Sequence, residues 1–277
     1  MKPVANYLLV LLLWAAQSVM AQPGPLRTAA QEGSAPKYLD AEGPATGHCP
    51  DILAALERVD KSLRFSIDPQ PTPLKRIEAG IKDGALDVAC ALLDTPLRNE
   101  IAFRISPPLF TLQERLVGRR DDNGTIQSLK DLAQIDDLVV TQSGASYAAD
   151  LRRHGVRVLE TPGGSAIALR NVANKRARFY YTNELTGAYY IKAEGLSDQL
   201  RLHPGVMQST PSYLWASRRL DPAIVRHLEQ AVAQLRSAQS FIGLGWHAML
   251  RQIVDLTLGS QKQIVDDLQR VAARSTA

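Results

Sequence analysis

A single arginine stands between two apolar stretches of the chain, in the segment DVACALLDTPLRNEIAF at residues 87–103. The guanidinium of Arg98 is planar, permanently charged and carries five N–H donors, so it suits a carboxylate or phosphate held by two parallel hydrogen bonds. Residues 87–93 are typical of a buried strand, and Asp94, Thr95 and Arg98 follow its carboxyl end, where open α/β sheets bind ligands. The pattern is that of a ligand clamp, but an arginine taken alone is more often a surface residue in a polar loop, and this alternative remains open from the residues alone.

A second candidate for anion binding is the sequence QSGAS at residues 142–146, between an apolar strand and an expected helix. Backbone N–H groups at a helix N-terminus lack intrahelical partners and lie at the positive end of the helix dipole, so they attract anions. The alternative is an ordinary helix start capped by Ser143 or Ser146, which needs no ligand. Both interpretations remain open from the residues alone.

Catalytic and metal-binding patterns are not found in the sequence. His48 is adjacent to Cys49, but neighbouring residues rarely form a productive pair of nucleophile and base. The five histidines are scattered and none forms a pair with metal-ligand spacing. The SGAS turn lacks the glycines of a nucleophile elbow, and the PGG turn at 162–164 lacks the lysine of a phosphate loop. We therefore expect no enzyme, no metal site and no cofactor.

Cys49 and Cys90 are the only cysteines of the chain. Cys49 precedes an expected helix and Cys90 lies in the strand that leads to Arg98, so we expect the two cysteines to approach the same edge of one folded unit. An even number of cysteines in an exported protein allows a disulfide. Two separately buried thiols are the alternative, and two cysteines without nearby histidines do not form a tetrahedral metal shell.

The first 21 residues have the pattern of a secretory signal peptide. Lys2 precedes an apolar core at residues 8–16, and Val19-Met20-Ala21 is a small-residue cleavage site. The apolar core is shorter than the roughly 20 residues of a membrane-spanning helix. Cleavage after Ala21 leaves Gln22 rather than a cysteine for lipid attachment, so the sequence predicts a free periplasmic protein. The formal net charge of +4 is spread without a basic block and does not favour nucleic-acid binding.

The apolar periodicity predicts two α/β units. The chain forms most of the first unit, crosses to form the second, and then returns to the first. For the first unit we expect strands at 26–30, 64–67 and 87–93 in a parallel core, with helices at 50–63 and 74–82. A crossing strand at 109–119 leads to the second unit, with strands at 138–141, 157–160 and 178–182 and helices at 146–154 and 165–174. A return strand at 212–218 is followed by helices at 224–235 and 249–268.

The pattern DVA-x-x-L-x-x-T-P-x-R-x-x-x-A-F, with TPLKRIEAGIKDG before it and SPPLFTLQERLVGRR after it, resembles the extracellular solute-binding proteins of family 3. These are periplasmic receptors for amino acids and similar small polar solutes. The resemblance continues through SLKDL at 128–132, VVTQSGASY at 139–147 and FYYTNELTGAYYI at 179–191, and covers nearly the whole mature chain. It implies a type II periplasmic binding protein fold, with two α/β lobes joined by two crossing strands. Lobe one would comprise residues 22–119 and 208–277, and lobe two residues 120–207.

The same resemblance implies a ligand site between the lobes. Such receptors hold a carboxylate between an arginine that matches Arg98, next to Thr95, and backbone amides that match Ala145 and Ser146. Asn183 stands where they carry a carboxylate for the ligand's ammonium. Gln31, Glu32 and Ser34 stand roughly where they often carry an acid and an aromatic ring. An amide can hydrogen-bond an ammonium but cannot neutralise it, which speaks against an ordinary amino acid. Organic acids, modified amino acids and small peptides remain open.

The expected function is therefore that of a monomeric periplasmic receptor. It would close on a small anionic or zwitterionic solute and deliver it to an ABC-type permease in the inner membrane. Two alternatives use the same fold, a dehydratase-like enzyme and a periplasmic sensor or accessory protein.

Overall fold

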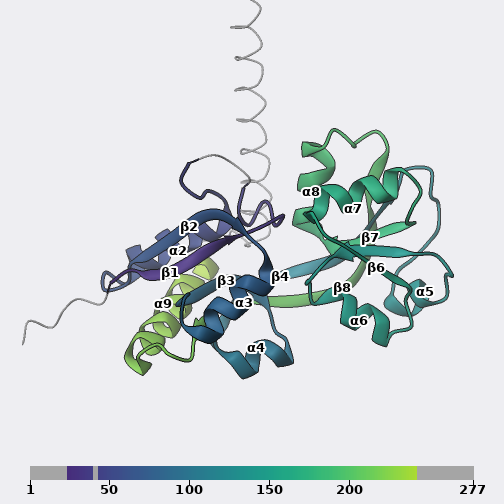
Figure 1. Cartoon of the computed structure of the whole chain (residues 1–277). Helices are drawn as coiled ribbons and strands as arrows, with labels where there is room; N and C mark the ends of the chain where they lie inside the picture. Colours follow the sequence, from purple (N-terminus) through teal and green to yellow (C-terminus); the bar gives the residue numbers. More distant parts are fainter. Residues whose placement is uncertain (1–23, 40–42, 242–277) are drawn as a thin grey trace, which may run out of the picture.

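The computed structural model of the protein describes residues 24–39 and 43–241. The expected signal peptide at 1–21 and the expected helix at 249–268 lie outside these residues. Figure 1 shows two lobes joined by the long strands β4 (Ala102–Arg119) and β8 (Leu200–Ser217). These strands pair with each other in antiparallel direction and contain the predicted crossing and return strands. The fold is thus the expected two-lobe α/β architecture, whereas the residue boundaries of the lobes remain a prediction.

Lobe one begins with a β-α-β unit. Strands β1 (Leu26–Gln31) and β2 (Phe65–Thr72) pair in parallel, with helix α2 (His48–Val59) between them in sequence. Helix α3 (Leu74–Asp83) ends at Gly84, whose φ of 75° is the left-handed conformation that glycine adopts at helix ends.

The predicted parallel core of lobe one is wrong for strand β3 (Val88–Leu93). This strand forms its ladder in antiparallel direction with β8, and one backbone bond, from Asp87 N–H to Arg27 O (2.8 Å), links its start to β1. The reason is topological, since β8 returns from the other lobe and occupies the edge beside β3. Sequence periodicity within β3 carries no information about a partner more than a hundred residues away.

The segment after β3 is a short helix, α4 (Pro96–Ile101), for which the sequence predicted no helix. The hydroxyl of Thr95 accepts a hydrogen bond from Arg98 N–H (3.3 Å), and Pro96 occupies the first turn, where its missing N–H has no cost. Arg98 is therefore held on a capped helical turn, with its backbone position determined by local contacts.

Lobe two contains the other strands of a six-stranded sheet in the order β3-β8-β4-β7-β5-β6. All three predicted strands and both predicted helices of this lobe are confirmed: β5 (Val139–Gln142), β6 (Val158–Thr161), β7 (Phe179–Asn183), α6 (Tyr147–Arg153) and α7 (Gly164–Ala173). Two helices were missed, α5 (Leu129–Ala133) and α8 (Glu184–Ala193). Helix α8 buries residues on most sides, among them Leu185, Tyr189 and Ile191, so it has no amphipathic stripe to detect.

Helix α9 (Pro222–Phe241) returns to lobe one. Its residues Leu228 and Val232 are fully buried in the same apolar cluster as Leu53 of α2 and Ile105 of β4. The final described element therefore packs into the core that also contains residues of β1 and α2, and Figure 1 shows α9 in the same lobe as these two elements. Among the described residues, no helix is both long and apolar enough to cross a membrane.

Cys49 and Cys90 form a disulfide that joins the start of α2 to β3 (S–S 2.05 Å). Reducing it is expected to lower the free energy of unfolding by about 2–4 kcal/mol, because a bridge between distant positions restricts the unfolded chain. Urea unfolding with and without reductant measures the change. A variant with both cysteines replaced by serine is the control, since its midpoint should not respond to reductant. Equal midpoints for the oxidised and reduced wild type would contradict the expectation.

Candidate functional site

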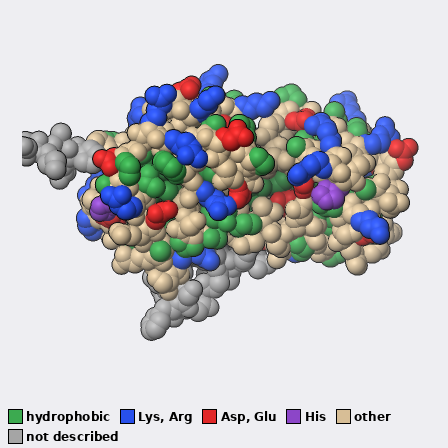
Figure 2. All heavy atoms as spheres, turned by 90° about the horizontal axis from the view of Figure 1, so that it is seen from below, with side chains coloured by type: hydrophobic (Ala, Val, Ile, Leu, Met, Phe, Trp, Pro, Cys, Tyr) green, Lys and Arg blue, Asp and Glu red, His purple; other side chains and the backbone are tan. Residues whose placement is uncertain are grey.

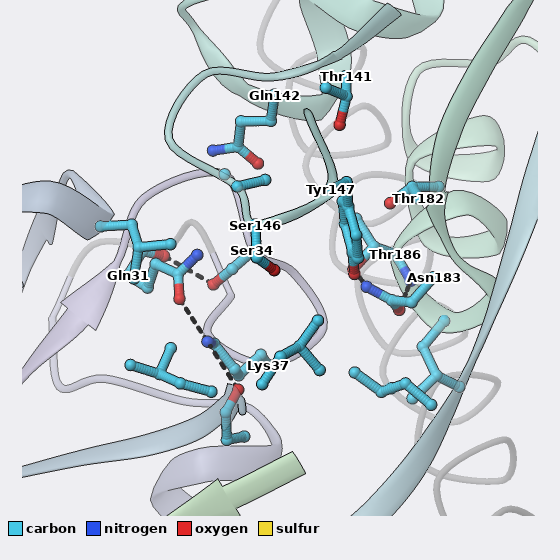
Figure 3. Close-up of a pocket in the computed structure, with 18 of the residues that line it drawn as sticks. Gln31, Ser34, Lys37, Thr141, Gln142, Ser146, Tyr147, Thr182, Asn183 and Thr186 are labelled. Carbon is cyan, nitrogen blue, oxygen red and sulfur yellow. Dashed lines mark hydrogen bonds between the residues drawn. The ribbon is translucent and has the colours of Figure 1, made fainter. Parts of the chain in front are cut away.

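A cavity of about 100 Å³ lies where the two lobes face each other. Its polar lining from lobe one consists of Gln31, Ser34, Lys37, His48 and Arg98. Its polar lining from lobe two consists of Thr141, Gln142, Ser146, Tyr147, Tyr180, Thr182, Asn183 and Thr186. Figure 3 shows the Gln31 and Lys37 side chains on one side and Tyr147, Asn183 and Thr186 on the other, with Ser34 and Ser146 between them. Side chains of both lobes are therefore directed into one space.

The two lobes touch each other beside the cavity. The Gln142 side-chain amide donates a hydrogen bond to Glu32 O (3.3 Å), and the buried Ser165 hydroxyl donates one to Gly33 O (3.1 Å). Gly33 has a φ of +59°, and a Cβ atom added to it would lie 2.9 Å from Gly164 Cα of the opposite lobe. A glycine at this position is what allows the two backbones to approach so closely. The structure is thus that of a closed cleft.

Arg98 lines the cavity and is only 4% exposed. Its Nε donates to Glu78 Oε1 (2.9 Å) and its Nη1 donates to Leu93 O (2.6 Å). Burial lowers the pKa of the guanidinium, and the Glu78 carboxylate opposes that shift. Two of its five N–H groups are engaged in these bonds, so the guanidinium is fixed in place and retains donors for another acceptor. Thr95 does not line the cavity, and its part is to cap the helix that carries Arg98.

Ala145 and Ser146, whose backbone amides were predicted to bind the ligand, both line the cavity, but their hydrogen bonds differ. Ala145 N–H donates to Gln142 O within the turn (3.2 Å), so its N–H already has a partner. Ser146 is the N-cap residue of α6, and its side chain makes no capping hydrogen bond. Neither Ser143 nor Ser146 therefore acts as the side-chain cap that the alternative interpretation required.

Asn183 lines the cavity and also caps helix α8. Its Oδ1 accepts from Thr186 N–H (3.0 Å) and its Nδ2 donates to the Thr186 hydroxyl (3.0 Å). The neighbouring Glu184 does not line the cavity, and its carboxylate lies 3.8 Å from Arg115 Nε. Glu184 therefore does not replace the missing carboxylate at Asn183.

Sequence reasoning missed Lys37, which Figure 3 shows below Gln31 and Ser34, joined to Gln31 by a hydrogen bond. Its ammonium donates to the side-chain oxygen of Gln31 and to Ala91 O (3.3 Å). Burial, and then repulsion from Arg98, lower the pKa of Lys37 to about 7. Nothing in the sequence indicated this role, because a lysine in a polar loop is most often exposed.

His48 was dismissed as a catalytic residue in the sequence, yet it also reaches the cavity. It is 3% exposed, and its Nε2 is buried without a hydrogen-bond partner among the described residues. Burial lowers the pKa of its imidazole to about 4, so the ring is neutral at physiological pH.

The charged groups of the described cavity lining are both cations, Lys37 and Arg98, and this lining contains no Asp or Glu. This excess of positive charge is confined to the cavity. On the face of the molecule in Figure 2, Lys and Arg side chains are interspersed with Asp and Glu over both halves. The described residues also contain no cluster of three or more His, Cys, Asp or Glu side chains that could hold a metal ion.

No protein-family model and no curated protein sequence matches the chain. Several solved structures, however, are similar to the chain. An amino acid ABC transporter substrate-binding protein, AbpA from Streptococcus pneumoniae, bound to L-arginine, has a TM-score of 0.65 at 15% identity, covering 85% of this chain and 95% of its own. An ancestral arginine-binding protein bound to arginine has a TM-score of 0.66 at 18% identity, covering 78% and 94%.

A third similar structure is AncCDT-1, an ancestral amino acid-binding protein described as a precursor of cyclohexadienyl dehydratase. Its TM-score is 0.64 at 20% identity, covering 77% of this chain and 90% of its own. At such identities these likenesses establish the fold, which is the two-lobe fold of solute-binding proteins that the sequence predicted.

Proposed function

We propose that this protein is a solute-binding receptor whose lobes close on a small molecule that carries at least one carboxylate. The fold supports solute binding, since the similar structures include proteins bound to amino acids. The cavity supports a small solute, because it encloses about 100 Å³ and one water needs roughly 10–15 Å³ of such space. It has room for roughly seven to ten heavy atoms, not for an extended peptide.

The observation that carries the proposal is the charge of the lining, two cations without a carboxylate. Two unit charges 4 Å apart interact by about 4 kcal/mol at an effective dielectric constant near 20. A carboxylate next to Lys37 and Arg98 gains such attraction, whereas a second cation is repelled and has no acid to pair with. The arginine that the two similar proteins bind would therefore be a poor ligand here.

The signal-peptide pattern and the similarity to an ABC transporter substrate-binding protein support the next step of the proposal. In this proposal the mature chain is a periplasmic monomer that hands its ligand to an ABC-type permease.

A thermal-shift screen tests the binding proposal. The panel contains lactate, succinate, malate, glutamate and arginine, with spermidine as the electrostatic control. A ligand at 100 times its dissociation constant stabilises the folded protein by about 2.7 kcal/mol, so a binder raises the melting temperature measurably. We expect stabilisation by lactate, succinate or malate, less by glutamate, whose ammonium lacks an acid to pair with, and none by arginine or spermidine. Stabilisation by the cations alone would contradict the proposal.

A dehydratase-like enzyme is the second candidate, favoured by the similarity to AncCDT-1. Such chemistry needs a group that accepts or donates a proton near neutral pH, and Lys37, with a pKa of about 7, is such a group. This candidate requires that the purified protein consumes a bound acid, which mass spectrometry of the mixture would detect. A receptor returns the acid unchanged.

A further inference from the structure

We propose that Lys37 determines ligand selectivity: its ammonium and the Arg98 guanidinium form a two-cation subsite at the end of β3 that takes carboxylates and rejects ligands carrying an ammonium. The proposal rests on the proposed function and specifies its ligand class as dicarboxylates and hydroxycarboxylates. It concerns a residue that sequence reasoning passed over.

The two cations are held by the same strand. Lys37 Nζ donates to Ala91 O (3.3 Å), and Arg98 Nη1 donates to Leu93 O (2.6 Å), two residues further along β3. Gln31 adds its side-chain oxygen to Lys37. The only interactions that hold the Lys37 ammonium here are with neutral oxygens, so its charge is not neutralised by a carboxylate among the described residues.

The backbone of β3 is distorted where it meets Lys37. Ala91 has a φ of 54°, in the left-handed region that residues other than glycine rarely adopt, and the pairing of β3 with β8 shifts register between Ala89 and Leu92. Such outliers gather at functional sites, where the surrounding structure maintains them. Here the distorted residue provides the carbonyl that accepts from Lys37.

The other titratable groups that line the cavity do not change this charge balance. Burial keeps His48 of α2 neutral, and burial raises the pKa values of Tyr147 of α6 and Tyr180 of β7, so both phenols stay protonated. Glu78 of α3 is paired with Arg98 and lies behind it, outside the cavity lining. The excess of positive charge in the site therefore comes from Lys37.

The imidazole of His48 indicates a further polar atom on the ligand. His48 lines the cavity, while its Nε2 is buried beneath that lining without a hydrogen-bond partner among the described residues, whereas buried polar atoms in native proteins are nearly always paired. When the ring turns toward the cavity, a ligand hydroxyl would supply that partner in either tautomer, and a second carboxylate would supply it when Nε2 carries the proton, which is why we specify dicarboxylates and hydroxycarboxylates.

The same arrangement couples binding of the ligand to the uptake of one proton by Lys37. In the closed cleft without ligand the pKa of Lys37 is about 7, because of burial and the neighbouring Arg98, so the side-chain amine is largely deprotonated there at pH 8. A bound carboxylate favours the charged form and raises that pKa. Binding above pH 7 therefore takes up a proton, and affinity falls as pH rises, by up to about tenfold per unit until the pKa of the complex is reached.

The test is isothermal titration with succinate and L-aspartate, which differ by one ammonium group. Titrations at pH 6, 7, 8 and 9, in two buffers with different ionisation heats, report affinity and proton uptake. For the wild type we expect succinate to bind at least tenfold more tightly than L-aspartate at pH 6, with proton uptake at pH 8. For Lys37→Gln we expect at least tenfold weaker succinate binding, no proton uptake and a reduced preference for succinate.

Lys75→Gln is the matched control, since Lys75 is exposed, lies next to Gly144 at the cleft and does not line the cavity. It should bind like the wild type at every pH. A flat pH profile of the wild type, or a Lys37→Gln protein with unchanged selectivity, overturns the role of Lys37 while leaving the receptor proposal standing. Failure of the wild type to bind any acid of the thermal-shift panel overturns both. The wild-type pH profile decides the matter even if Lys37→Gln does not fold.

Discussion

Replacing Arg98 by alanine is expected to weaken binding of a carboxylate ligand at least tenfold. The guanidinium is almost fully buried at the cavity, is held by Glu78 and Leu93 O, and has donors beyond those two bonds. A charge-assisted pair between a guanidinium and a carboxylate contributes more than about 1.4 kcal/mol, which corresponds to a factor of ten in the dissociation constant. Titration calorimetry with the acid that gives the largest thermal shift measures the change.

A structural effect of this substitution must be separated from the loss of a ligand contact. Arg98→Ala leaves the largely buried Glu78 without its partner, and breaking a buried ion pair costs about 3–5 kcal/mol. The double variant Arg98→Ala/Glu78→Gln removes both charges, so it should regain much of that stability in urea unfolding and still bind weakly. Glu78→Gln alone keeps the guanidinium and removes its neutralising neighbour, so it should bind at least as tightly as the wild type.

These variants give opposite results for the two possible roles of Arg98. If Arg98 only stabilises lobe one, Arg98→Ala binds the acid with unchanged affinity at a temperature where it is folded. In that case Arg98 does not bind the ligand's carboxylate, and other residues bind the anion.

Replacing Gly33 by alanine is expected to prevent closure of the lobes and to weaken binding at least tenfold. An added Cβ would lie 2.9 Å from Gly164 Cα, and a backbone atom cannot move aside as the end of a side chain can. The apparent dissociation constant rises in inverse proportion to the fraction of molecules that can close. Small-angle scattering should show that saturating ligand compacts the wild type and leaves Gly33→Ala extended.

Gly195→Ala is the matched control for the backbone effect. Gly195 has a similar φ of +66°, and an added Cβ would meet nothing within 4 Å. Alanine in the left-handed conformation costs about 1–2 kcal/mol in either position, so both variants should lose comparable stability. Only Gly33→Ala should lose affinity and closure. Equal affinity of both variants would show that the contact between Gly33 and Gly164 is not needed for binding.

Much of the fold was predictable because its elements are locally encoded. The strands of lobe two alternate with helices, and each has its own apolar pattern and turn residues, so nearly every boundary was found to within about two residues. The missed elements are those without such a pattern. Helix α5 is too short to show a period, α4 is defined by its Thr95 cap and Pro96, and α8 is buried on most sides.

The site was predictable only in part. Arg98 and Ser146 were expected at the site from their positions after strands, because strand ends in this architecture open onto the cleft, whereas Asn183 and Gln31 were expected there only from the resemblance to solute-binding proteins. Lys37 and His48 lie on either side of a connection whose path depends on the packing of lobe one, and no spacing rule relates them to Arg98. Their perturbed pKa values arise from burial, which a sequence does not display.

By itself the sequence determined that the chain forms two α/β units and passes between them twice. It also determined that one arginine stands at a strand end suited to binding an anion. These conclusions depend on interactions between residues close in sequence, which periodicity and capping patterns record. The tertiary structure decided the antiparallel partner of β3, the disulfide, the contact between Gly33 and Gly164, and the convergence of Lys37 with Arg98. Each of these joins residues far apart in the chain, so it exists only once the packed core has brought them together.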